Sequence, residues 1–354
     1  MDRVTGMGTA AGLAILDSVP DGFLDCVARD LHLVLDGPTL IELAGERGPP
    51  LFVSILQHGN EVSGLGAVQR VIGRYQNQPL PRSLMLLVSN VEAARHGLRR
   101  LDGQPDYNRV WPGTPNHGDT AEAKVMAQVH ARAVDRGAIA AIDIHNNTGR
   151  NPHYAVVCNR DPPTLGLAAL FSRRAVCFRG IPGTQTASFS GLIPAITAEC
   201  GVPGEAANSE AAACLVEAAL HLDQLPDGPS DGTALELYHT LGVVRVREDV
   251  SFCFGAGEVE LRFDPAVEEN NFRELKAGTV LAETDHLMPL KMIDEAGDDV
   301  AELYFDASGG QLRLRRSAVP AMLTVDPRIV RQDCLCYLME RLLVPDDASK
   351  EFLG

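Results

Sequence analysis

A histidine and a glutamate stand three residues apart in the segment QHGNEVSG (57–64), as His58 and Glu61. The segment lies between an apolar run that predicts a buried strand and a run that predicts a helix. Both side chains therefore point to one side of the first helical turn. Zinc binds imidazole nitrogen and carboxylate oxygen, and catalytic zinc sites use three protein ligands and a water molecule. The pair therefore predicts two ligands of such a site. A surface histidine beside a helix-capping glutamate would give the same spacing, which arises at about the frequency expected by chance.

Polar side chains close four separate apolar runs of the sequence. These residues are His58, Asn90, His145 and Glu199. In open parallel sheets, ligands bind outside the carboxyl ends of the strands, and a buried histidine or glutamate needs polar partners. We therefore expect the four side chains to meet in one crevice, where His145 is the third ligand of a single zinc ion. Asp143 lies on the same face of its strand as His145, which is compatible with a carboxylate that orients the imidazole ring.

Three further charged residues could take part in hydrolysis. Glu199 is the candidate for acid–base chemistry, because a carboxylate near zinc can accept a proton from the metal-bound water and pass it to a leaving nitrogen. Arg99 and Arg109 are candidate anion and oxyanion binders, because a planar guanidinium fits a carboxylate and can stabilise charge that grows on a carbonyl oxygen. The simpler alternatives are a strand-end salt bridge for Glu199 and solvated surface charges for the two arginines. Together the residue types favour zinc-dependent hydrolysis of an amide.

Apolar strand-like runs alternate with amphipathic helix-like runs between residues 51 and 223, which is typical of an α/β domain with a largely parallel sheet. Upstream, the run LHLVLDGPTLIEL (31–43) predicts a hairpin that turns at Asp36-Gly37. The predicted helices cover residues 62–75, 120–136 and 205–225. The predicted strands cover residues 51–57, 83–90, 139–145, 153–159 and 193–200.

A domain boundary is predicted at the segment PDGPSDG (226–232), which is rich in Pro, Gly and Asp. We expect an α/β hydrolase domain over residues 1–229, in which an N-terminal extension and the hairpin reach to about residue 45. Alternating sequences such as VVRVREDVSFCF predict a smaller β-rich domain over residues 230–354.

Composition and charge restrict the partners. The 354-residue chain has a formal net charge of -16 and a pI near 5.0, so its field would repel nucleic acid and anionic membranes. No apolar run approaches the roughly 20 residues needed to span a bilayer, and the first residues make a poor signal peptide. Eight cysteines without a CxxC pair predict reduced thiols rather than a disulfide framework. We expect a cytoplasmic enzyme that acts on a small molecule, and a homo-oligomer is compatible with these features.

Several motifs occur in the order found in the succinylglutamate desuccinylase and aspartoacylase family of the zinc carboxypeptidase-like superfamily. Five ordered motifs are far more specific than any one of them. In chain order, the first motif resembles the family's His-Gly-Asn-Glu ligand motif and the second resembles the segment with the carbonyl-polarising arginine. The third resembles the Asp-Leu-Asn-Arg-x-Phe motif, the fourth the segment with the third ligand, and the fifth the segment with the catalytic glutamate. The segments are HGNE (58–61), NVEAARHGLRR (90–100), DYNRVWPG (106–113), IDIH (142–145) and ITAECG (196–201).

The resemblance implies a role for each site residue. Arg99 would polarise the scissile carbonyl, Asn108 and Arg109 would bind the substrate carboxylate, and Glu199 would be the catalytic glutamate. It also implies a zinc-carboxypeptidase-like mixed sheet flanked by helices, followed by a smaller β-rich domain, in which NNFRELKAGTVLAETD (270–285) is similar to a stretch of the family. The resemblance covers roughly residues 30–325.

Some positions depart from the family pattern. Trp111 replaces the usual Phe, and Gln104-Pro105 is a small insertion before the Asn-Arg motif. The segment GIPGTQTASFSG (180–191) has no arginine where some members hold the side-chain carboxylate of the substrate. A tyrosine that reaches the site of some relatives aligns with either Glu302 or Tyr304. The acyl group and the amino acid therefore stay open.

The expected activity is hydrolysis of the amide bond of an N-acyl amino acid, by a zinc-dependent deacylase. Two alternatives stay open. One is a carboxypeptidase-type peptidase that cleaves a small peptide with the same residues. The other is a catalytically silent protein that keeps the metal site and the fold for interaction.

Overall fold

A computed structural model describes residues 12–114, 118–147, 149–178, 181–229 and 235–342. The chain divides into two compact units, each assembled from several segments. The first contains residues 1–145, 181–197 and 209–225, and the second contains residues 146–180, 198–208 and 226–354. The predicted boundary between residues 229 and 230 adjoins residues 230–234, which lie outside the described residues, as do residues 1–11 of the predicted N-terminal extension. The boundary stays a prediction.

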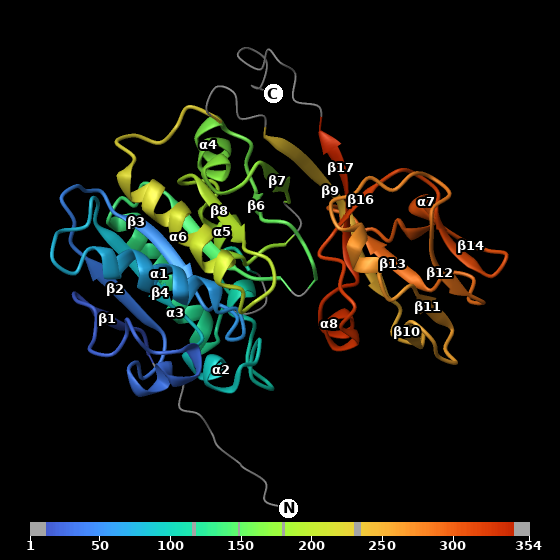
Figure 1. Cartoon of the computed structure of the whole chain (residues 1–354), viewed down its shortest axis with the longest axis horizontal. Coiled ribbons are helices and arrows are strands. Elements are labelled where there is room, and N and C mark those ends of the chain that lie inside the picture. The colour runs from blue at the N-terminus through green and yellow to red at the C-terminus, as the bar shows by residue number, and fades with distance from the viewer. Residues whose placement is uncertain (1–11, 115–117, 148, 179–180, 230–234, 343–354) are drawn as a thin grey trace, which may run out of the picture. The chain divides into compact units, whose positions relative to one another are not determined.

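The first unit is built on a mixed sheet whose strand order is β1-β2-β4-β3-β5-β8. Strand β3 pairs in parallel with β4 and with β5, whereas β2 runs antiparallel to β4. Every residue of β3, β4, β5 and β8 is buried, which explains why the sequence shows these strands as continuous apolar runs. Figure 1 shows β2, β3 and β4 side by side. The strands are β1 (Ala14–Leu16), β2 (Thr39–Leu43), β3 (Leu51–Ile55), β4 (Leu84–Val88), β5 (Ala141–His145) and β8 (Ala195–Glu199).

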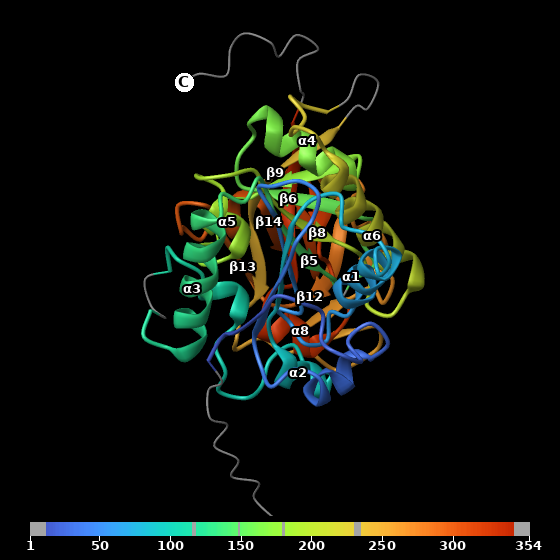
Figure 2. The same cartoon turned by 90° about the vertical axis from the view of Figure 1, so that its left-hand side faces the viewer.

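Helices cover both faces of this sheet. Figure 2 shows α1 and α6 on one face and α3 and α5 on the other. On the second face, Phe52 of β3 packs against Trp111 and Phe189 in one apolar core. Thr120 caps α3, because its side chain accepts a hydrogen bond from the backbone of Ala123. The helices are α1 (Ser63–Arg74), α2 (Val91–His96), the 3-10 turn η2 (Tyr107–Arg109), α3 (Ala121–Asp135), α5 (Gln185–Phe189) and α6 (Ala206–His221), whose first three residues belong to the second unit.

The second unit contains a further set of paired strands in the order β6-β7-β9-β17-β16, with β13 also paired to β9, and a separate five-stranded sheet in the order β10-β11-β12-β15-β14. The expected mixed α/β fold with an additional β-rich C-terminal sheet is therefore confirmed. Helices in this unit are α4 (Pro162–Phe171), η3 (Val267–Asn270), α7 (Ala301–Tyr304) and α8 (Pro327–Gln332). The strands are β6 (Tyr154–Val157), β7 (Arg174–Cys177), β9 (Glu236–Val246), β10 (Phe252–Phe254), β11 (Leu261–Phe263), β12 (Val280–Thr284), β13 (Leu290–Ile293), β14 (Phe305–Ser308), β15 (Gln311–Leu314), β16 (Val319–Ala321) and β17 (Cys336–Leu342).

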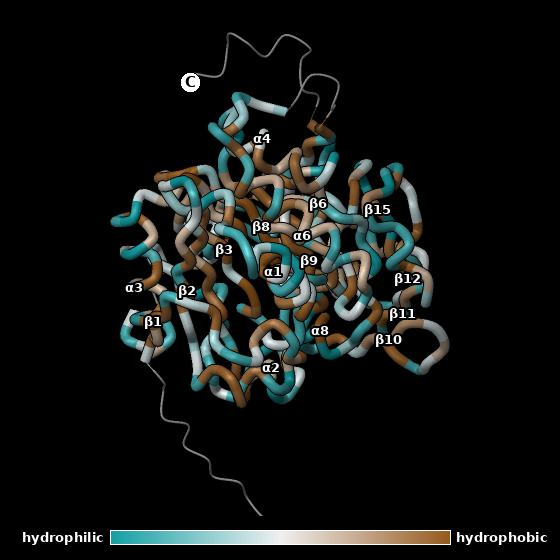
Figure 3. The backbone as a smooth tube through the Cα atoms, turned by 60° about the vertical axis from the view of Figure 1, so that its left-hand side comes forward, coloured by the Kyte–Doolittle hydropathy of each residue, from teal (hydrophilic) through white to brown (hydrophobic). Residues whose placement is uncertain are grey.

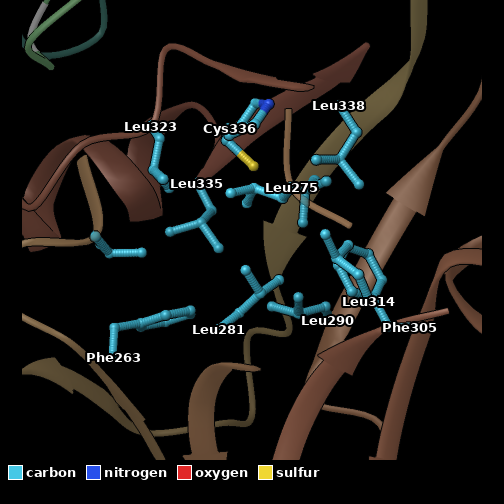
Figure 4. A pocket seen from close by; sticks show the side chains of 13 residues that line it. Phe263, Leu275, Leu281, Leu290, Phe305, Leu314, Leu323, Leu335, Cys336 and Leu338 are labelled. Atoms are coloured by element: carbon cyan, nitrogen blue, oxygen red, sulfur yellow. The ribbon is translucent and has the colours of Figure 1, made fainter. Parts of the chain in front are cut away.

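An apolar pocket lies inside the core of the C-terminal β-rich part. Figure 4 shows side chains such as Phe263, Leu281 and Phe305 around it. The sulfur of Cys336 also lines the pocket, and burial raises the pKa of this thiol to about 12, so it stays protonated and unreactive at neutral pH. The pocket offers packing surface and no group for acid–base chemistry.

Residues 31–43 correct one prediction, because they do not form a hairpin. Residues Ala28–Leu33 form the 3-10 helix η1, and only Thr39–Leu43 form a strand, which pairs with β4. The reason is that Leu31 and Leu35 are both buried four residues apart, a helical spacing, and the amide of Leu35 donates to the carbonyl of Leu31 at 2.8 Å.

Two global expectations can be compared with the structure. None of the eight cysteines, all of which lie in the described part of the chain, forms a disulfide bond. Among the described residues, no helix combines the length and the apolar character needed to cross a bilayer. The hydropathy colouring shows hydrophobic segments gathered in the interior and hydrophilic segments in outer loops (Figure 3).

Candidate active site

Three potential metal ligands converge at the ends of β3 and β5. His58 and Glu61 lie in the turn between β3 and α1, and His145 is the last residue of β5. One ligand atom from each of the three lies within 4.8 Å of the others. The Nδ1 atoms of His58 and His145 lie 2.8 Å and 2.7 Å from the two carboxylate oxygens of Glu61. All three residues are buried, so the structure brings the predicted ligand set together.

The far side of each imidazole contacts a second carboxylate. Nε2 of His58 lies 3.0 Å from Asp106, and Nε2 of His145 lies 2.8 Å from Asp143. A carboxylate that accepts the Nε2 proton fixes the tautomer in which Nδ1 is free to bind a metal. The donor set of two Nδ1 atoms and one carboxylate, with both rings oriented from behind, fits a zinc ion. The contact between Asp143 and His145 agrees with their placement on one face of the strand.

These charges strongly shift the ionisation of the site. Burial alone would raise the pKa of Asp106, but the charge and the hydrogen bond of His58 outweigh burial and hold the pKa of that carboxyl well below its usual range. Burial also acts to raise the pKa of Glu61, and the two imidazoles overcome this effect and lower it. For His145, burial acts to lower the pKa, whereas Asp143 and Glu61 raise it well above the usual value. The cluster holds the carboxylates of Glu61 and Asp106 ionised, the state that suits a cation.

We expect Asp143→Asn to weaken zinc binding by about 10-fold or more, because the residue behind a metal-binding histidine commonly has an effect of this size. Asp143 is fully buried and also accepts a hydrogen bond from Ser54 at 2.7 Å, so an amide, with one acceptor oxygen in place of two, would keep at most one of the two contacts. Competition with a chromogenic chelator measures the affinity. A zinc affinity equal to that of the wild type would show that Asp143 does not support the ligand.

Arg99 lies beside the three candidate ligands, and its role toward a substrate carbonyl stays a prediction. Its guanidinium lies 3.4 Å from Glu61 and 3.3 Å from Asp106. Gly97 ends α2 in a left-handed conformation with φ of 62° and turns the chain toward Arg99. The carbonyl of Arg99 accepts a hydrogen bond from the amide of Gly59 at 3.1 Å. A Cβ atom on Gly59 would lie 2.2 Å from the backbone nitrogen of Ala94, so only glycine fits between His58 and α2.

Asn108 and Arg109 belong to η2 and lie in the same unit. The side chain of Asn108 is buried, and its Nδ2 lies 3.3 Å from Nε2 of His145 while its Oδ1 accepts a hydrogen bond from the amide of Gln185 at 3.0 Å. Arg109 is partly exposed and donates to the carbonyl of Asn108 at 2.7 Å. The structure therefore places Asn108 next to His145, while Arg109 contacts Asn108 and its charge helps to lower the pKa of Asp106. Substrate binding by the two residues stays a prediction.

A buried polar network extends behind His145. Asp143 contacts Ser54, Ser54 contacts Gln185, and Oε1 of Gln57 accepts a hydrogen bond from the indole of Trp111 at 2.7 Å. This last contact explains the tryptophan in place of phenylalanine, because a buried indole nitrogen needs an acceptor. This network could not be predicted from the sequence, since polar residues inside apolar strands do not reveal their partners. The contact of Asp106 with His58 was not predicted either. The position of Asp106 in DYNR, two residues before Asn108, could have indicated that it lies near the site.

Glu199 ends β8 and belongs to the second compact unit. It is buried, and its Oε2 accepts a hydrogen bond from Nδ2 of Asn147 at 3.2 Å. The backbone of Asn147 is fixed by a hydrogen bond to the carbonyl of Gly201 at 3.1 Å. Burial, together with the charge of Glu199, raises the pKa of Tyr154 well above its usual value, so this phenol stays neutral. Glu199 is thus held in a polar buried setting within its own unit.

The two candidates for the tyrosine position both lie on α7. Glu302 is exposed, whereas Tyr304 is half-buried and has the guanidinium of Arg316 at 5.7 Å from its ring centroid. Which of them aligns with the tyrosine of some relatives stays open.

Solved structures of deacylases share the fold. The succinylglutamate desuccinylase from Chromobacterium violaceum is 17% identical, with a TM-score of 0.54 over 84% of this chain and 86% of that chain. A succinylglutamate desuccinylase/aspartoacylase from Rhodobacter sphaeroides is 17% identical, with a TM-score of 0.57 over 85% and 88%. Murine aminoacylase 3 is 17% identical, with a TM-score of 0.53 over 84% and 97%. These likenesses define the class of fold. No curated protein matches the chain significantly.

Residues 47–219 match the family model of the succinylglutamate desuccinylase/aspartoacylase catalytic domain. The match confirms the predicted resemblance of this part of the chain to that family. Every predicted site residue, from His58 to Glu199, lies inside the matched segment.

Proposed function

We propose that this protein is a zinc-dependent deacylase that hydrolyses the amide bond of an N-acyl amino acid. The observation that carries the proposal is the convergence of His58, Glu61 and His145, with a second carboxylate behind each imidazole. Such a site, in a segment that matches the catalytic domain of a deacylase family, supports hydrolysis with one zinc ion per chain.

The ligands would hold zinc through Nδ1 of His58, the carboxylate of Glu61 and Nδ1 of His145. A bound zinc ion would supply Lewis acidity and make a water molecule nucleophilic near neutral pH. Glu199 accepts a proton from the attacking water and delivers it to the leaving nitrogen, so that the amide is converted into a carboxylic acid and a free amine.

The arginines and Asn108 would orient the substrate. Arg99 polarises the scissile carbonyl, since its guanidinium already faces the ligand cluster and would stabilise negative charge on the carbonyl oxygen. Arg109 and Asn108 bind the carboxylate of the amino acid, because a guanidinium and an amide offer donors that match two carboxylate oxygens. In the structure, Arg99 contacts Glu61 and Asp106, and Arg109 donates to the carbonyl of Asn108. Nδ2 of Asn108 lies 3.3 Å from Nε2 of His145.

We expect purified protein to contain about one zinc ion per chain and to release free amine from at least one N-acyl amino acid. Metal analysis measures the first result, and an amine-detecting assay over N-acetyl and N-succinyl amino acids and dipeptides measures the second. Dipeptides alone as substrates would instead favour a carboxypeptidase-type peptidase. Zinc bound without turnover of any compound would favour a catalytically silent protein, and a chain that cannot be loaded with metal would refute the enzymatic proposal.

The proposal includes a cytoplasmic location and a small-molecule substrate. The eight free thiols are compatible with a reducing compartment. The net charge of -16 disfavours partners that carry many phosphates, and the positive charge of Arg99 and Arg109 gives a local means of recruiting one anionic amino acid.

A further inference from the structure

Two features of the sequence have no part in the chemistry proposed above, and the structure joins them. Asn90 follows β4, and Gln104 belongs to the small insertion before the Asn-Arg motif. Nδ2 of Asn90 donates to Oε1 of Gln104 at 2.9 Å, and Nε2 of Gln104 donates to Oδ1 of Asn90 at 3.3 Å. The two side chains therefore form a reciprocal amide pair.

The Asn90 side of this pair is fixed to the central sheet. Asn90 is 1% exposed, and its backbone amide donates to the carbonyl of Leu56 at 2.8 Å, just beyond β3. Its Oδ1 also accepts from the backbone of Ala93 at 3.1 Å and so caps α2. A buried side chain with these contacts has little freedom to move, which makes Asn90 a firm anchor.

The Gln104 side of the pair is fixed to a compact turn. Oε1 of Gln104 accepts from the amide of Leu101 at 3.1 Å, and the amide of Gln104 donates to the carbonyl of Leu101 at 3.2 Å. Gly103 has φ of 77°, a left-handed conformation that glycine adopts without strain and that closes the turn. Residues 101–104 therefore form one hydrogen-bonded turn, and the amide pair joins this turn to Asn90.

This turn lies between two residues of the candidate site. Arg99 precedes it and faces Glu61, while Asp106 follows it and contacts Nε2 of His58. The guanidinium of Arg99 also lies 3.3 Å from Asp106, so both ends of the loop meet beside the ligands. A displaced turn would move the guanidinium and the carboxylate together.

We propose that Gln104, through its amide pair with Asn90, is a positioning residue for Arg99 and Asp106. The insertion that departs from the family pattern then supports the geometry of the site and does not merely lengthen the loop. The pair holds Asp106 against His58, which orients a zinc ligand, and holds Arg99 where it can reach a substrate carbonyl. The effect on Arg99 rests on the proposed function, whereas the effect on zinc binding needs only the ligand set.

Three single substitutions test this proposal. Gln104→Ala removes the side-chain amide that the turn contributes to the pair. Asn90→Asp removes the Nδ2 donor but keeps the oxygen that caps Ala93, so α2 retains its cap. Arg100→Ala is the matched control, because exposed Arg100 donates to the backbone carbonyl of Gln104 at 2.9 Å and has no part in the amide pair. For each variant, zinc affinity is measured by chelator competition, kcat and KM by amine release, and thermal stability by circular dichroism.

We expect Gln104→Ala and Asn90→Asp each to lower zinc affinity and kcat by about 10-fold or more, the size seen when the residue behind a metal ligand is removed. KM should change by less than about twofold, and Arg100→Ala should stay within about twofold of the wild type in all three quantities. The double variant should lose little more than either single variant, because the two residues act as one pair.

A purely structural turn would lower the thermal midpoint without changing zinc affinity or kcat, and that result would overturn the proposal. Wild-type values of zinc affinity in Gln104→Ala would overturn it as well. If the wild-type protein hydrolyses none of the substrates, the proposed function fails, but the zinc affinities of the three variants still decide whether the amide pair positions Asp106.

Discussion

Glu199→Gln is expected to keep about one zinc ion per chain and to lower kcat by about 10²- to 10⁴-fold, the usual contribution of a general acid–base group. The glutamine has the shape of the glutamate but cannot accept the proton of the attacking water. It still offers an oxygen to Nδ2 of Asn147, which lies 3.2 Å from the carboxylate in the wild type, so the local packing is retained. Steady-state kinetics and metal analysis of the same preparation measure both effects.

The control for this experiment is Glu258→Gln, which removes the same charge from an exposed residue of the second unit. It should leave kcat unchanged. Turnover of Glu199→Gln at the wild-type rate would exclude Glu199 from the reaction, and loss of zinc from this variant would assign it to the metal site instead.

Glu61→Ala is expected to abolish stoichiometric zinc binding and, with it, all detectable hydrolysis. Glu61 is the ligand that faces both imidazoles, at 2.8 Å and 2.7 Å, so its removal leaves two histidines without the carboxylate that completes the set. Inductively coupled plasma analysis after dialysis measures zinc, and the amine assay measures activity. If the variant still binds one zinc ion per chain, residues other than Glu61 must complete the zinc site.

Removal of the metal from the wild type provides the matching test. Treatment with a chelator should abolish activity, and added zinc should restore it in the wild type but not in Glu61→Ala. Zinc should also stabilise the folded chain, by about 4 kcal/mol when free zinc is 1,000 times its dissociation constant. A thermal midpoint of the wild type that does not respond to zinc would argue against a preformed site.

The convergence of the three candidate ligands and the mixed sheet could be predicted because the sequence marks them locally. Strands β3, β5 and β8 are fully buried and appear as unbroken apolar runs, and their last polar residues mark the edge of the sheet. Strand β3 pairs in parallel with β5, which brings His58 and His145 to the same edge. The predicted strands were two to three residues longer than those observed, because the sequence does not show where the backbone pairing of a strand ends.

Other parts of the structure could not be predicted, because they depend on contacts between distant segments or lack a clear local pattern. The pairing of Asn90 with Gln104 joins a helix cap to an insertion, and neither residue shows a pattern that points to the other. Strand β7 has four residues, too few for a clear period. Helix α4 begins with Pro162-Pro163, which resembles a chain break but is well suited to a first helical turn, where Asp161 caps the backbone of Thr164.

The spacing of the three ligands along the chain has a consequence for biosynthesis. His58 and Glu61 are made together, but His145 follows much later, after β4, α2, η2 and α3. Its ring reaches Glu61 only when β5 has been added beside β3 in the sheet. A growing polypeptide that still lacks β5 offers zinc only two of its three protein donors. If the chain binds zinc as proposed, loading with metal would follow assembly of the sheet during synthesis and would not direct it, in contrast to small zinc modules that need the ion to fold at all.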